Sequence, residues 1–153
     1  MKSTQINAFA IVGIKTRTTN VDMQAAKDIP ALWEKFMSEN ISDKIPNKLD
    51  DKIYAVYTNY ESDYMGAYDM YIGCKVDAKN EILTDLIKLD IPESSYEEFI
   101  AEGKLNDGIV YNKWMEIWKS DLDRRYSADF EVYQSGIGQD EETKVSILIA
   151  TKS

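Results

Sequence analysis

The sequence predicts an α+β fold in which two βαββ units form one antiparallel sheet, with two main helices flanking a central cleft. The predicted elements follow the order strand, helix, strand, strand, twice over 153 residues. Two successive strands of the first half align with two of the second at one offset of 76 residues, which pairs Tyr57 with Tyr133. Each half has one amphipathic helix and too few strands to bury it, so the halves must share a sheet. We expect one domain over residues 1–153, with pseudo-repeats at about residues 6–78 and 82–153.

The first half is predicted to contain a strand, a helix and a hairpin. Residues 8–18 favour a strand, because they are apolar at the start and alternate later. The helix follows, with Asp28 as its N-cap, Pro30 in its first turn and apolar residues at helical spacing beyond. After a polar linker, residues 52–61 and 68–77 favour strands, and the short segment between them favours a hairpin.

The second half repeats this order. Residues 82–91 fit either a strand or a short helix, and the hydrophobic period does not decide between them. Residues 94–105 favour a strand. The pattern over residues 107–125 predicts an amphipathic helix, with Arg124 and Arg125 at its end, where the helix dipole favours positive charge. The remaining predicted strands are residues 129–133 and 144–152.

Composition and charge exclude several kinds of function. The chain has 27 acidic against 18 basic residues, and this net charge of -9 repels phosphate backbones and attracts cations. We therefore expect no direct nucleic-acid binding. With no His and one Cys, Cys74, the sequence excludes zinc sites of the usual Cys/His kind and His-dependent nucleophilic catalysis, and we expect no metal or cofactor. The absence of a signal peptide, of a bilayer-spanning run and of any intramolecular disulfide predicts a cytoplasmic protein with no membrane segment.

Glu131 is the main candidate binding residue. In a strand over residues 129–133, period-two alternation puts Phe130 and Val132 on one face and Glu131 and Tyr133 on the other. A carboxylate beside an aromatic ring can form a pocket for a lipophilic cation, because it supplies the counter-ion while the ring supplies apolar area and cation–π attraction. The alternative is a strand whose outer face is wet, with Glu131 solvated.

The predicted duplication places Glu131 in a special position. Pairing two units about a pseudo-two-fold axis leaves a groove along that axis, and ligands prefer such interfaces. At the position equivalent to Glu131, the first unit has Ala55. One half therefore offers a small residue and the other a charge, which is the asymmetry that a cation site needs.

Aromatic residues are the other candidates for the cleft. Trp114 and Trp118 lie one turn apart on the second predicted helix, and simple core packing is the alternative for at least one of them. Trp33 has a similar place on the first helix. Tyr57 and Tyr133 share the face of Glu131. Two further candidates, on less certain faces, are Tyr54 and Tyr71.

Several segments together resemble a known family. They are AIVGIKTRTT, IPALWEKF, IYAVYT, YDMYIGCKV, YNKWMEIW, and DFEVY followed by KVSILIA. With these segments the chain resembles the GyrI-like, or AraC-type, effector-binding domain of multidrug-responsive transcription regulators and stand-alone proteins. The resemblance implies a duplicated βαββ sheet with a central ligand cleft, where lipophilic cationic compounds bind near a glutamate of the next-to-last strand, here Glu131, between aromatic walls.

The chain departs from this family in two respects. It has no helix-turn-helix segment and no basic patch, so a role in transcription would require a transcription regulator or another protein as partner. The last strand has Ser146 and Leu148 where some relatives place a second acid or a tyrosine.

Three functions remain open from the sequence. The first is a stand-alone module that binds lipophilic, often cationic, small molecules. The second, which the resemblance also implies, is a hydrolase of electrophilic small molecules, with Glu131 as base and Tyr133 or Tyr57 as proton donor. The third is a protein inhibitor that acts through its acidic surface.

Overall fold

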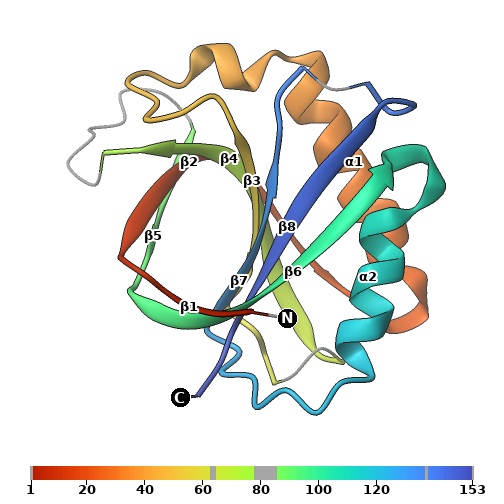
Figure 1. The fold of residues 1–153 in the computed structure, drawn as a ribbon. Helices are drawn as coiled ribbons and strands as arrows, with labels where there is room; N and C mark the ends of the chain where they lie inside the picture. The colour runs from red at the N-terminus through yellow and green to blue at the C-terminus, as the bar shows by residue number, and fades with distance from the viewer. Residues whose placement is uncertain (1, 63–64, 78–85, 137, 153) are drawn as a thin grey trace.

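The computed structural model describes residues 2–62, 65–77, 86–136 and 138–152, and within them eight strands form one antiparallel sheet with two α-helices (Figure 1). The strands are β1 (Lys2–Ile6), β2 (Phe9–Thr19), β3 (Ile53–Thr58), β4 (Ala67–Val76), β5 (Ile87–Ile91), β6 (Ser94–Lys104), β7 (Ala128–Tyr133) and β8 (Glu142–Ala150). The helices are α1 (Ala25–Ser38) and α2 (Ile109–Trp118), and the short 3₁₀ helices are η1 (Val21–Met23), η2 (Ile41–Lys44) and η3 (Leu105–Asp107). The predicted α+β class, with an antiparallel sheet and two helices, is confirmed.

The order of the strands in the sheet is symmetric. It runs β1-β6-β8-β7-β3-β4-β2-β5, so β3 and β7 are the central pair. If each strand of the first half changes places with its counterpart in the second (β1 with β5, β2 with β6, β3 with β7 and β4 with β8), the new order is the old one read from the opposite edge. Each edge strand pairs with a strand of the other half: β1 pairs with β6, and β5 pairs with β2. This arrangement is the shared sheet that two βαββ units require, while the repeat boundaries themselves stay a prediction.

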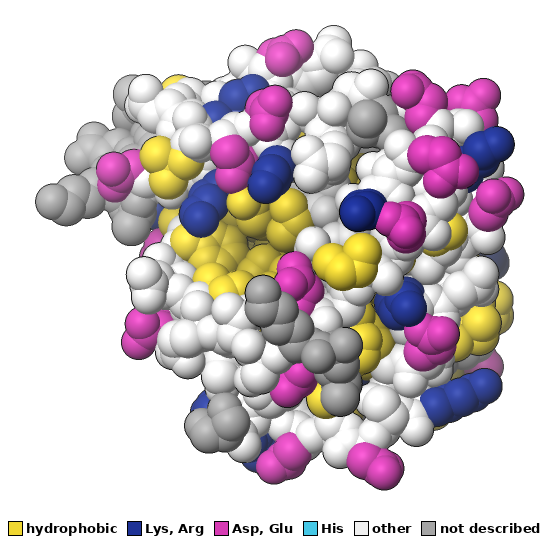
Figure 2. Space-filling model, in the orientation of Figure 1, with side chains coloured by type: hydrophobic (Ala, Val, Ile, Leu, Met, Phe, Trp, Pro, Cys, Tyr) yellow, Lys and Arg dark blue, Asp and Glu magenta, His cyan; other side chains and the backbone are white. Residues whose placement is uncertain are grey.

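The sheet curls strongly, and its concave side is lined by apolar side chains. Gly13 of β2 lies opposite Gly73 of β4, and a Cβ atom on either residue would collide with the backbone of the partner strand. Only glycine allows this close approach, so the two strands can bend together. The inside of the curl holds a cluster that includes Tyr54, Tyr71 and Phe130. In Figure 2 the open end of the curl is a hollow with a hydrophobic floor, and both basic and acidic side chains are spread over the surrounding face.

Both helices cover the outer face of the sheet (Figure 1). Leu32 and Phe36 of α1 pack on β2, β3 and β4, in a cluster that also buries Cys74. Ile117 of α2 packs on Val145 and other apolar residues of β6 and β8. The two helices thus have separate cores, one in each half of the sheet. None of the helices in the described part of the chain is long and apolar enough to cross a bilayer.

The helix boundaries differ from the sequence prediction. The first helix begins at Ala25 rather than after Asp28, so Asp28 lies inside its first turn. The Asp28 carboxylate does not cap the helix and instead accepts a hydrogen bond from the Gln24 side chain. The second helix ends at Trp118, well before residue 125. Its last turn tightens, since the backbone N–H and the hydroxyl of Ser120 both donate to the Ile117 carbonyl oxygen.

Two strand predictions are also refined. The ambiguous segment 82–91 is a strand over Ile87–Ile91, and residues 82–85 lie outside the described residues. The polar β1 strand was not predicted, because KSTQI has no clear apolar alternation. The predicted hairpin of β3 and β4 and the strand at 94–105 are found as expected.

Candidate functional site

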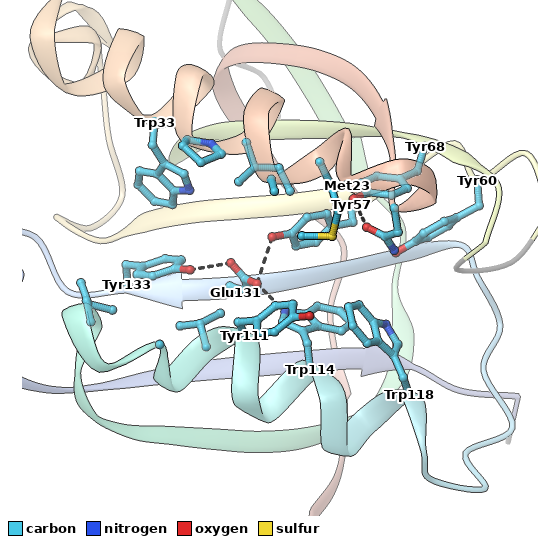
Figure 3. Close-up of a pocket in the computed structure, with 18 of the residues that line it drawn as sticks. Met23, Trp33, Tyr57, Tyr60, Tyr68, Tyr111, Trp114, Trp118, Glu131 and Tyr133 are labelled. Atoms are coloured by element: carbon cyan, nitrogen blue, oxygen red, sulfur yellow. Dashed lines mark hydrogen bonds between the residues drawn. The ribbon is translucent and has the colours of Figure 1, made fainter.

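A cavity of about 800 Å³ lies between α1 and α2, over the central strands of the sheet (Figure 3). Its walls come from both helices, and its floor comes from β3 and β7. In Figure 3, Trp33 of α1 lies on one side of Glu131 and Trp114 of α2 lies on the other. A cavity of this size can enclose a drug-sized molecule.

Glu131 lies on the floor of this cavity and is only 1% exposed. Its carboxylate accepts three hydrogen bonds from three different elements (Figure 3). The hydroxyl of Tyr133 donates to Oε1 at 2.6 Å, and the hydroxyl of Tyr57 donates to Oε2 at 3.0 Å. The indole Nε1–H of Trp114 also donates to Oε2, at 2.6 Å. The carboxylate is therefore held in place by neutral donors.

The local strand geometry explains the position of Glu131. On β7, Phe130 and Val132 point into the curl, where they pack with the concave cluster. Glu131 and Tyr133 point to the helix-covered side, where both line the cavity. The side-chain alternation of a strand produces this division, so the wet face considered from the sequence is not found.

Burial dominates the electrostatics of the site. It raises the pKa of Glu131 above its ordinary value, and the three hydrogen bonds oppose this shift only in part. Burial next to Glu131 also raises the pKa values of Tyr57 and Tyr133 well above the usual range, so both hydroxyls stay protonated and act as donors at neutral pH. Among the described residues, no salt bridge includes Glu131; the buried arginine nearby, Arg124, is paired with Asp129.

Aromatic rings form the walls around the carboxylate. The rings of Trp33 and Tyr133 meet edge to face, with centroids 4.9 Å apart. Tyr57 and Trp114 meet in the same manner at 5.5 Å, and Trp114 lies 6.2 Å from Trp118. Their π faces and apolar edges give the cavity the surface that a flat or bulky lipophilic ligand requires.

Six of the eight residues predicted for the site line the cavity. They are Glu131, Tyr133, Tyr57, Trp114, Trp118 and Trp33. Tyr54 and Tyr71 do not, which corrects the prediction for these two residues. Both lie inside the curl on the other face of the sheet, because Tyr54 is an odd number of residues from Tyr57 on the same strand and Tyr71 alternates with the helix-facing Met70 and Ile72.

A second buried polar group at the cavity was missed from the sequence. Arg124 lines the cavity, and its Nη2 donates to Asp129 Oδ2 at 2.7 Å. The hydroxyl of Tyr60 donates to the same oxygen, and the backbone N–H of Ala150 donates to Oδ1. Asp129 is completely buried, two residues before Glu131 and on the same face of β7. The period-two spacing of Asp129 and Glu131 in the sequence was the signal that could have revealed this second group. No group of three Cys, Asp or Glu residues in the described ranges could hold a metal ion.

Comparison with known proteins identifies the family. Residues 4–151 match the family model described as "Cass2: Integron-associated effector binding protein". The chain belongs to the Cass2 family. Since this family consists of effector-binding proteins, the resemblance to GyrI-like effector-binding domains is confirmed.

Individual relatives match this Cass2 family member over nearly their whole length. The crystal structure of integron cassette protein VCH_CASS2 from the mobile metagenome of Vibrio cholerae superposes with a TM-score of 0.78 at 32% identity, covering 99% of this chain and 95% of that one. YobU of Bacillus subtilis (strain 168), named as a candidate transcriptional regulator, is 29% identical over 153 residues, covering 97% of this chain and 96% of YobU. The structure of SAV2435 bound to tetraphenylphosphonium has a TM-score of 0.77 at 21% identity, covering 99% of this chain and 93% of that one, and shares the fold.

Proposed function

We propose that this protein binds lipophilic cationic small molecules in the cavity between α1 and α2, with Glu131 as the counter-ion and the aromatic rings as walls. The observation that carries the proposal is the state of Glu131. It is a buried carboxylate in an apolar cavity, and the partners described for it are neutral donors. Burying a charge without an opposite charge costs free energy, which hydrogen bonds reduce only in part. A bound cation would supply the missing charge.

Three further observations support the proposal. The chain belongs to an effector-binding family. SAV2435, which has the same fold, is described with bound tetraphenylphosphonium, a lipophilic cation. The net charge of -9 favours the approach of cations from solution, and the rings beside Glu131 favour them once bound.

The site geometry favours binding over hydrolysis. A general base must have a water molecule within hydrogen-bond reach and must take its proton. The Glu131 carboxylate is 1% exposed and already accepts three hydrogen bonds, an arrangement that holds a charge in place. Whether a transcription regulator or another protein reads the bound state stays a prediction.

Titration with a matched pair of compounds tests the proposal. Tetraphenylphosphonium carries a positive charge, and triphenylphosphine oxide offers similar rings without one. All three tryptophans line the cavity, so ligand entry should change tryptophan emission, and calorimetry gives the affinity. Glu131→Gln should weaken phosphonium binding by about tenfold to a hundredfold, the loss of one partly desolvated charge pair. It should change binding of the oxide little.

The control variant is Glu142→Gln, which removes an exposed carboxylate at the start of β8 and should leave both affinities unchanged. Equal losses for the cation and the neutral compound in Glu131→Gln would show that the carboxylate is not a counter-ion. No binding of either compound to the native protein would count against the proposal as a whole.

A further inference from the structure

The oxygens of Glu131 are shielded even though the residue lines a large cavity. The cavity holds about 800 Å³, but Glu131 is 1% exposed. The hydroxyl groups of Tyr57 and Tyr133 and the indole N–H of Trp114 occupy the space directly around the two oxygens (Figure 3). A ligand in the cavity therefore meets aromatic groups first and the carboxylate behind them.

The capacity of the carboxylate to accept hydrogen bonds is also mostly used. A carboxylate offers about four lone-pair positions, two on each oxygen. On Oε2 both positions are taken, by Tyr57 and Trp114. On Oε1 one is taken, by Tyr133. One position on Oε1 remains, but Glu131 is only 1% exposed, so a ligand N–H can reach it only after one of the surrounding donors moves aside. A donor that moves aside is then left unpaired inside the protein.

We propose that the cavity selects cations without N–H groups, such as quaternary ammonium and phosphonium ions, over protonated amines of the same shape. An onium ion brings charge but no donor, so it needs no lone pair. Its attraction to Glu131 is Coulombic and acts across the ring layer, and the faces of the surrounding rings add cation–π attraction. A protonated amine gains the same charge attraction, but to donate its N–H to Glu131 it must break the network around the carboxylate.

Arg124 does not change this selection. It lines the same cavity, but its guanidinium is paired with Asp129 at 2.7 Å, so the two charges compensate each other locally. Glu131 thus remains the uncompensated charge among the described residues that line the cavity. The inference rests on the proposed function and specifies the ligand class of the same site.

A pair of ligands that differ by one methyl group tests the inference. Benzyldibutylmethylammonium has no N–H, and benzyldibutylamine is protonated at pH 7 and has one. Calorimetry should give tighter binding of the quaternary ion by about fivefold to a hundredfold, the usual penalty for one unsatisfied buried donor. Equal affinities for the two cations, or tighter binding of the amine, would overturn the inference.

A variant of the network shows whether Glu131 causes the difference. Tyr133→Phe removes the donor on Oε1 and leaves that oxygen free, so the affinity ratio of the two cations should shrink towards one. Tyr71→Phe is the matched control, because it removes a tyrosine hydroxyl inside the curl, on the other face of the sheet, and should keep the native ratio. If Tyr133→Phe unfolds, Tyr57→Phe opens one position on Oε2 and serves the same purpose.

The outcomes separate this inference from the proposed function. If both cations bind more tightly than the neutral amide N,N-dibutylbenzamide, which is of similar size, but bind equally to each other, cation binding stands and the N–H selection fails. If neither cation binds more tightly than the neutral compound, both fail. A native preference that persists unchanged in the folded Tyr133→Phe and Tyr57→Phe variants would show that the hydrogen-bond network does not produce it.

Discussion

Ala55 of β3 and Glu131 of β7 lie directly opposite each other in the central strand pair of the sheet. They are also the two residues that the 76-residue offset between the halves makes equivalent. The middle of the sheet is therefore where corresponding positions of the two halves meet. The Cβ atoms of such opposite residues are about 5 Å apart, so the small side chain of Ala55 leaves room for the donors around Glu131.

Enlarging Ala55 should disturb both the fold and the site. Ala55 is completely buried, so Ala55→Leu should lower the free energy of unfolding by about 1–3 kcal/mol through overpacking. It should also weaken phosphonium binding, because the added methyl groups compete for the space beside Glu131. Urea unfolding and calorimetry measure the two effects. Ala101→Leu, a similarly buried alanine under α2, should cost stability but leave the affinity unchanged; parallel loss of affinity there would argue against a local effect at residue 55.

The affinity for a permanently charged ligand should depend on pH. Burial raises the pKa of Glu131 above its ordinary value of 4.5, and a bound cation favours the ionised carboxylate. Affinity should therefore be constant at high pH and fall as the pH drops through the raised pKa, with proton release on binding in that range. Calorimetry with tetraphenylphosphonium in buffers of different ionisation enthalpy measures both. In Glu131→Gln the affinity should be independent of pH, and an equal pH dependence there would assign the effect to another group.

The contribution of Glu131 to the stability of the unliganded protein should change with pH in the opposite direction to the ligand affinity, being largest at low pH. Because the pKa of Glu131 is higher in the folded state than in the unfolded state, this residue favours folding most at pH values below its unfolded pKa. That contribution is lost as the pH rises through the folded pKa. The difference in unfolding free energy between the native protein and Glu131→Gln, measured in urea, should change across this range. A difference that is the same at every pH would contradict the raised pKa.

Removing the charge of Arg124 should destabilise the protein strongly. Arg124→Met leaves Asp129 buried without its cation, which should cost about 3–5 kcal/mol of unfolding free energy. The neighbouring Arg125 has an exposed side chain whose Nε donates to the Thr151 carbonyl oxygen at 3.3 Å, so Arg125→Met should cost about 1 kcal/mol or less. Urea denaturation of the two variants compares them directly. A loss of unfolding free energy in Arg124→Met as small as that in Arg125→Met would show that the Arg124–Asp129 pair is of little importance to stability.

The close approach of β2 and β4 should tolerate no side chain. A methyl group at Gly13 would collide with the backbone of β4, so Gly13→Ala should cost more than about 3 kcal/mol, beyond ordinary overpacking. Gly136 lies in a turn at φ +75° with open space around its Cβ position, so Gly136→Ala should cost only about 1–2 kcal/mol of backbone strain. Thermal or urea unfolding measures both. A mild effect at Gly13 would mean that the sheet can flatten there.

The sequence by itself determined the features that depend on local geometry. The alternation along residues 129–133 decided that Glu131 and Tyr133 share one face of β7, because side-chain direction in a strand is a property of the strand alone. The antiparallel sheet with two helices followed from the order of the elements. The tertiary structure decided which distant groups meet. Trp114 donates to Glu131 from α2, Tyr54 and Tyr71 lie in the curl, and Arg124 pairs with Asp129 beyond a helix that ends early. Sheet register, curvature and helix ends depend on packing between remote segments, which local spacing along the chain does not encode.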